Sequence, residues 1–127
     1  MSRAARRFAA IAAFLGLAAV ILGAFGTHAL KSRLDPAQLA VFDTGVRYQM
    51  YHALALLVLA LLIDRVPSRG LTAAGCLFST GIILFSGSLC LLATVHWHWL
   101  GPVTPLGGLC FMAGWLTLGI SLLRARP

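Results

Sequence analysis

The side chains best suited to do chemistry lie in one short segment, VRYQMYHALAL, at residues 46–56. On a helix, Tyr48 and His52 would lie four residues apart on one face, and Arg47 and Tyr51 would form a second row beside them. An imidazole can exchange protons or ligate a metal near neutral pH. The spacing predicts a candidate polar pocket that opens outward and is formed by five residues: Arg47, Tyr48, Tyr51, His52 and His28.

The same segment also fits a purely structural interpretation, which we favour for the histidine. Asp43 and Arg47 are spaced for an i,i+4 ion pair, with the arginine side chain extended toward the membrane surface. His52 could hydrogen-bond to a neighbouring helix and hold the helices together, as isolated polar residues in membranes often do. The partners considered for it are three hydroxyls: Ser86, Ser88 and Thr94.

Three imidazoles are expected on one outer surface: His28, His96 and His98. They make a copper or zinc site conceivable, but the neighbouring tryptophans also suit an interfacial belt. We therefore assign no metal ligands and no cofactor, and keep an outer-face metal-binding protein as a further alternative. The three cysteines show no CxxC or Cys/His ligand spacing: Cys76, Cys90 and Cys110.

The composition indicates which solvent surrounds these residues. Of the 127 residues, 60% are apolar and 10% are charged, and the mean hydropathy is +0.92. A small soluble domain buries only about two thirds of its surface, so this chain carries more apolar surface than it could hide from water. Lipid is the expected environment, and a disordered tail, a disulfide scaffold and a large multidomain enzyme are excluded. We expect one domain over residues 1–127.

Four apolar stretches approach the roughly 20 residues that cross a bilayer. They predict an all-α membrane protein with four transmembrane helices in up-down-up-down order: Phe8–Phe25, Val46–Ile63, Leu71–Val95 and Leu106–Leu123. The first stretch follows three arginines and also resembles a secretory signal peptide, with residues 27–29 as a weak cleavage site. Its apolar run is longer than a usual signal core, so we expect a retained helix.

Basic residues outnumber acidic ones by ten to three, which gives a net charge of +7. A basic excess can indicate nucleic-acid binding, but these residues lie at the ends of the apolar stretches, where membrane topology and anionic head groups explain them better. Seven lie with the two termini and the second loop, and three lie on the other side: Arg3, Arg6, Arg7, Arg65, Arg69, Arg124 and Arg126 against Lys31, Arg33 and Arg47. This count predicts that both termini are cytoplasmic.

The connection at residues 26–45 is expected to be structured. Asp35 suits a helix cap, Pro36 suits the first helical position, and Gln38 completes a capping box. Apolar residues then recur at helical spacing. We therefore expect an interfacial amphipathic helix in this first loop, which turns near Gly45 into the second span.

The second span must carry polar groups into the membrane because its apolar part is short. From Ala53 to Ile63 there are eleven residues, or roughly 16 Å of helix, about half a bilayer. With Ile63 at the inner boundary, His52 lies near the midplane and Arg47 about 6 Å below the outer boundary. Polar groups at these depths cost free energy unless they face the protein interior, a water-filled cavity or each other.

Four sequence blocks resemble one known family: GAFGTHALK at 23–31, VRYQMYHALAL at 46–56, LFSGSL at 84–89 and TPLGG at 104–108. In these blocks and their order, the chain is similar to the domain-of-unknown-function 423 family, small bacterial inner-membrane proteins that include YgdD-type and transmembrane-protein-256-like members. The resemblance implies a four-span fold in the inner membrane and supplies no reaction. Cys90 and residues 96–99 depart from the family pattern, which leaves the two histidine-containing blocks as the better candidates for a shared role.

Three kinds of function fit a membrane protein of this size. An enzyme would need a base within reach of a nucleophile and a third orienting group, and the sequence shows no such constellation. A small oligomeric transporter or channel with a polar pocket around His52 stays open, although no carboxylate is placed at mid-membrane. The best fit is a non-enzymatic structural or accessory component whose partners are membrane lipids, other membrane-protein subunits or a second copy, and not nucleic acid.

Overall fold

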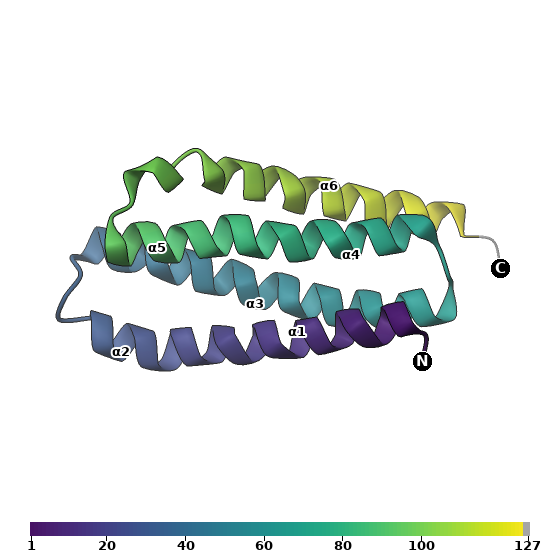
Figure 1. Ribbon diagram of the computed structural model, residues 1–127, viewed down its shortest axis with the longest axis horizontal. Coiled ribbons are helices and arrows are strands. Elements are labelled where there is room, and N and C mark those ends of the chain that lie inside the picture. Colours follow the sequence, from purple (N-terminus) through teal and green to yellow (C-terminus); the bar gives the residue numbers. More distant parts are fainter. Residues whose placement is uncertain (126–127) are drawn as a thin grey trace.

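The computed structural model describes residues 1–125 and shows four long, antiparallel helical stretches with both termini at one end (Figure 1). The first stretch contains α1 (Arg3–Ile21), the π-helical turn η1 (Leu22–Gly26) and α2 (Thr27–Leu30). The second is α3 (Pro36–Arg65). The third contains α4 (Arg69–Gly81), the π-helical turn η2 (Ile82–Ser86) and α5 (Gly87–Val95). The fourth is α6 (Val103–Arg124), preceded by the 3₁₀ turn η3 (His98–Leu100).

All four predicted spans are confirmed by these stretches. Each is 27 to 30 residues long and apolar enough to cross a membrane. At 1.5 Å per residue, such helices are about 40–45 Å long, which exceeds the roughly 30 Å hydrocarbon core and carries their ends into the head-group regions. The chain is therefore an all-α, four-span membrane protein in up-down-up-down order.

The helices form an open row and not a closed bundle. α3 packs between α1 and the α4–α5 stretch, and α4 packs against α6, so the order across the row is α1, α3, α4–α5 and α6 (Figure 1). Among the described residues, α1 and α6 do not meet. The two outer helices therefore each present most of their surface to the membrane.

Small residues on α1 allow its close contact with α3. Ala5, Ala12 and Ala19 are buried along one side of α1, where small side chains let two backbones approach each other in lipid. Between Ala5 and Ala12, the ring of Phe8 reaches α4, since a Cβ added at Gly75 would lie 2.8 Å from its Cζ atom. Alanine and glycine thus allow the short distances between α1 and its neighbouring helices.

The interfacial helix expected in the first loop is the beginning of the second span. Its predicted start is confirmed: Asp35 caps α3 in a capping box with Gln38, and Pro36 is the first helical residue. The turn expected near Gly45 is absent, because α3 continues unbroken to Arg65. Gly45 is buried, and a Cβ there would lie 3.1 Å from the Ser86 carbonyl oxygen. The glycine therefore serves close packing and does not redirect the chain.

The π-helical turn η2 lies between two glycines of neighbouring helices. Gly45 of α3 faces the carbonyl of Ser86, and Gly107 of α6 faces Phe85, whose Cα atom would be 2.7 Å from a Cβ at position 107. A π-helical turn carries an extra residue in its hydrogen-bonded loop. The widened backbone fits here because both neighbours lack a side chain at the point of contact.

Candidate functional site

His52 is the centre of the most organised polar cluster in the spans. It is 5% exposed, and its Nε2 atom lies 3.1 Å from the indole Nε1 of Trp115. Its Nδ1 atom lies 2.8 Å from the carbonyl oxygen of Tyr48, one turn earlier on α3. Because an indole N–H only donates, Nε2 must accept, and Nδ1 carries the proton that is donated to the carbonyl. These partners assign a neutral imidazole with a defined tautomer.

Aromatic rings enclose this imidazole on several sides. The ring of Phe111 stacks on it with centroids 3.6 Å apart and an interplanar angle of 9°. Phe78 meets the imidazole edge-on at 5.6 Å, and Trp115 packs against Phe78 at 5.0 Å. Such aromatic contacts add stabilisation beyond buried area alone, so the ring is held by packing as well as by hydrogen bonds.

Two phenylalanine–glycine pairs hold the aromatic rings in place. A Cβ added at Gly81 of α4 would lie 2.5 Å from Phe111 of α6, and one added at Gly114 of α6 would lie 2.7 Å from Phe78 of α4. Each helix therefore inserts a phenylalanine ring into the space left by a glycine of the other. This reciprocal packing fixes Phe78 and Phe111, and through them the position of His52.

The bond to Trp115, like the stacking of Phe111 on His52, joins helices whose backbones do not pack on each other. Within residues 1–125, no Cα atom of α3 comes within 8 Å of a Cα atom of α6. Between these helices lies a groove of about 270 Å³, whose lining includes Tyr51 and Trp115. Most of the lining is aliphatic, half of it leucine, and His52 is not part of it. The histidine cluster is thus closed, and the open space next to it is apolar.

The structure brings together three of the five predicted pocket residues. Tyr48 lies with its ring centroid 6.0 Å from those of both Tyr51 and His52. Arg47 instead pairs with Asp43 at 2.5 Å, as the i,i+4 spacing predicts, and its side chain is 64% exposed. His28 lies exposed on α2, and no described contact joins it to the cluster.

The hydroxyls considered as partners of His52 bond elsewhere. Ser88 pairs with Thr104 of α6 at 2.6 Å, and Thr94 donates to the carbonyl of Cys90. Ser86 is buried, and its hydroxyl has no hydrogen-bond partner among the described residues. The interhelical hydrogen bond predicted for His52 is therefore present, but with an indole in place of a hydroxyl.

Sequence reasoning missed a second polar contact of the same kind. Gln49 is buried, and its Nε2 atom donates to the carbonyl oxygen of Leu15 across 2.9 Å, which joins α3 to α1. Its position, three residues before His52 and on the same side of the helix, was the available signal. α3 thus uses one polar side chain toward each outer helix of the row.

The three histidines expected on one outer surface do not assemble into a ligand set. The closest polar neighbour of His96 is Gln38, with Nε2 3.4 Å from its Nδ1 atom. No three His, Cys or Asp side chains among residues 1–125 are grouped to hold a metal ion. The three cysteines are free, and Trp97 and Trp99 stack at 5.9 Å on the exposed surface expected for them.

Comparison with known proteins identifies the family to which the chain is similar. Residues 22–108 match the family described as "Protein of unknown function (DUF423)". The chain belongs to this family. The DUF423 match confirms the resemblance predicted from the four sequence blocks, and it includes His52 but ends before Phe111 and Trp115.

Curated relatives of this DUF423 protein are named as membrane proteins. The UPF0382 membrane protein YwdK of Bacillus subtilis is 43% identical over 118 residues, which cover 92% of this chain and 96% of the relative. The UPF0382 membrane protein SH2409 of Staphylococcus haemolyticus is 40% identical, with 92% and 95% covered. The UPF0382 inner membrane protein YgdD of Escherichia coli is 38% identical, with 94% and 88% covered. No solved structure matches the chain.

Proposed function

We propose that this protein is a non-enzymatic structural or accessory component of the bacterial inner membrane that binds membrane lipids and partner membrane-protein subunits or a second copy of itself. One observation carries the proposal: the open row leaves the outer helices without a partner on most of their surface. Large apolar side chains cover these faces, with Phe14 on α1 72% exposed and Leu116 on α6 65% exposed. In the membrane these faces meet lipid or another protein.

The polar side chains inside the spans support a structural role. His52 bonds α3 to α6, Gln49 bonds α3 to α1, and Ser88 bonds α5 to α6. Each uses its polar atoms between helices of the same chain, where such bonds stabilise membrane bundles. A transport path through His52, the alternative function, would require the imidazole to leave both Trp115 and the Tyr48 carbonyl.

The location and orientation also belong to this proposal. The relative from Escherichia coli is named an inner membrane protein, and the excess of arginine at the end with both termini favours a cytoplasmic position for that end. Within the described chain, six arginines lie there: Arg3, Arg6, Arg7, Arg65, Arg69 and Arg124.

Photo-cross-linking from the outer helices tests the proposal. A photoreactive residue replaces Phe14 or Leu116 in the full chain, and in a control variant it replaces Ser32 in the 31–35 connection. After irradiation in the membrane and mild solubilisation, mass spectrometry identifies the adducts. We expect discrete protein or lipid adducts from positions 14 and 116 and background labelling from position 32. Recovery of an adduct-free monomer from all three variants would contradict the proposal.

A further inference from the structure

One face of α3 exposes a pair of charged side chains within the second span. Asp43 and Arg47 form an ion pair, and their side chains are 46% and 64% exposed. No other carboxylate among residues 1–125 pairs with Arg47. The two charges cancel, so the pair as a whole is neutral but strongly dipolar. What surrounds it in the membrane therefore decides its free-energy cost.

Contacts with the neighbouring helices give the depth of this pair. Gly23 of η1 lies against Val46 of α3, and Gly45 of α3 lies against Ser86 of η2. At 1.5 Å per residue, Gly23 is about 10 Å from the end of α2, and Ser86 is about 14 Å from the end of α5. The helical stretches extend only about 5–8 Å beyond each side of the hydrocarbon core, so the backbone at Arg47 lies inside that core. Charges at this level cost free energy unless protein or water covers them.

The exposed face of α3 continues from the ion pair as one row of side chains. Its members are spaced three or four residues apart and so lie on one side of the helix: Asp43, Arg47, Tyr51, Leu54, Val58 and Leu61. We call these six residues the α3 row. The last four are each more than half exposed, and three of them also line the groove of about 270 Å³ between α3 and α6. From Arg47 to Leu61 the steps alternate between four and three, the spacing with which two helices pack along their length at a small angle.

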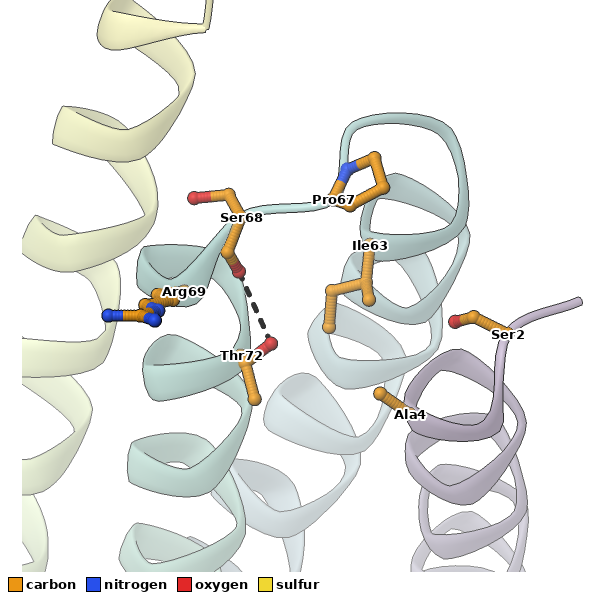
Figure 2. Close-up of a pocket in the computed structure, with 7 residues that line it drawn as sticks. All are labelled: Ser2, Ala4, Ile63, Pro67, Ser68, Arg69 and Thr72. Atoms are coloured by element: carbon orange, nitrogen blue, oxygen red, sulfur yellow. Dashed lines mark hydrogen bonds between the residues drawn. The ribbon is translucent and has the colours of Figure 1, made fainter.

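The larger cleft at the end with both termini lacks such a feature. Figure 2 shows this cleft of about 500 Å³ between α1 and α4, with Ser2 and Thr72 on its two walls. The Thr72 hydroxyl donates to the Ser68 carbonyl, and the Arg69 side chain points away from the cleft, toward α6. With that arginine turned away, the described lining presents no charge that would select a partner. The α3 row does present one.

The ion pair favours a partner that is itself neutral and dipolar. A lipid acyl chain offers no polar atom, and an anionic head group would compete with Asp43 for the guanidinium. A second copy of the chain offers the matching chemistry, since its own α3 row presents the same acid and the same base at the same depth. With a twofold axis along the membrane normal, the two pairs would form a closed ring. Each guanidinium could then donate to both carboxylates, because it has five N–H groups.

We propose that the protein forms a twofold homodimer through the α3 row. The Asp43–Arg47 pairs of the two copies contact each other toward the end opposite both termini, and the remaining side chains of the row pack on their counterparts beside the groove. The dimer thereby removes the ion pair from lipid. The proposal rests on the part of the proposed function in which a second copy is a partner, and it names the surface that this copy occupies.

Disulfide cross-linking in native membranes tests the surface. Single cysteines replace Leu54, Val58 or Leu61 in a full chain without the three native cysteines. A control cysteine replaces Phe14, an exposed residue of α1 at a similar depth, since the neighbouring Leu15 carbonyl bonds to α3. After brief oxidation we expect a covalent dimer from the row positions and little from position 14, because a disulfide requires two Cα atoms within about 7 Å of each other.

The contribution of the charges is measured by Förster transfer between donor-labelled and acceptor-labelled copies of the full chain in lipid vesicles. R47Q and D43N should each weaken association by at least about tenfold, because each leaves a covered charge without its partner. The control R33Q removes an exposed arginine outside the α3 row and should associate like the wild type. Circular dichroism confirms that each variant is folded.

Three results would overturn the dimer surface. They are cross-linking from the row that is no stronger than from position 14, wild-type association by R47Q and D43N, and adducts of the row cysteines with a different membrane protein in place of a dimer. Each of these results leaves the proposed accessory function intact. That function is contradicted instead when the photoreactive variants at positions 14 and 116 yield neither protein nor lipid adducts.

Discussion

Trp115 and His52 are 63 residues apart in the sequence and are joined by a hydrogen bond of 3.1 Å. The bond crosses from α6 to α3, whose backbones do not pack on each other within the described chain. Together with the Tyr48 carbonyl it occupies both ring nitrogens of the histidine. The type and depth of His52 suggested a chemical role, but both of its ring nitrogens are used in hydrogen bonds that hold the helices in place.

Loss of the indole donor should destabilise the protein measurably. Trp115→Phe leaves Nε2 of His52 unpaired in a buried site, and we expect a loss of about 1 kcal/mol in the free energy of unfolding. In a double-mutant cycle with His52→Ala, the coupling energy should be about 0.6–1.7 kcal/mol, the range of hydrogen bonds between membrane helices. Unfolding in detergent, followed by circular dichroism, measures both values.

The control for this cycle is Trp99→Phe. Trp99 is 69% exposed near the turn before α6, so its loss should change stability by less than about 0.5 kcal/mol. A coupling energy of zero between positions 52 and 115 would show that the bond contributes nothing to the fold.

The close contact between Gly107 and η2 predicts a large effect of one methyl group. A Cβ at position 107 would lie 2.7 Å from Cα of Phe85, and backbone cannot yield as a flexible side chain can. Gly107→Ala should therefore cost about 2 kcal/mol or more. Gly119→Ala on the same helix has no atom within 4 Å of the new methyl, and should be neutral or stabilising by about 0.5–1 kcal/mol. Equal thermal stability of the two variants would contradict the close approach.

Two polar residues in the middle of α3, Arg47 and Gln49, should respond differently to substitution. Gln49→Met removes the bond to the Leu15 carbonyl and should destabilise the protein by about 1 kcal/mol. Arg47→Gln breaks an exposed ion pair, which is worth about 0–1 kcal/mol. Thermal unfolding of both variants in the same detergent gives the comparison. If Arg47→Gln destabilised the protein more than Gln49→Met, the exposed ion pair would not account for the role of Arg47, and the expectation would be wrong.

Thiol labelling from outside the cell tests the orientation. In a background without the three native cysteines, Ser32→Cys should react with a membrane-impermeant maleimide in intact cells, because the 31–35 connection is proposed to be external. Ser2→Cys should react only after the membrane is made permeable. Both substitutions replace an exposed serine, and cysteine is close to serine in size. The reverse pattern would show that the termini face outward.

Local signals in the sequence predicted much of the fold. Apolar length gave the four spans, and the capping box at Asp35 placed the start of α3 at the residue where it begins. The ion pair of Asp43 and Arg47 followed from their spacing alone. Each of these features depends on residues within a few positions of one another, so periodicity and capping rules suffice for them.

Contacts between distant segments could not be predicted in this way. Gly45 was predicted to mark a turn because glycine often does. Its actual role is close packing against Ser86, some forty residues later in the chain, and no local pattern shows that contact. Trp115 was one apolar residue in a uniformly apolar span, and in lipid such spans carry little periodicity to show which face is inward. The partner of His52 and the Phe78–Gly114 and Phe111–Gly81 pairs therefore needed the structure.

Nitrogen NMR of His52 tests the central claim most directly. The full chain is labelled with ¹⁵N-histidine, reconstituted in lipid nanodiscs at neutral pH, and assigned by comparison with His52→Ala. The structure predicts a neutral ring with the proton on Nδ1, and Nε2 as acceptor of the Trp115 indole proton, so that Trp115→Phe shifts the Nε2 resonance. A proton on Nε2, or an Nε2 resonance unchanged by Trp115→Phe, would contradict the account.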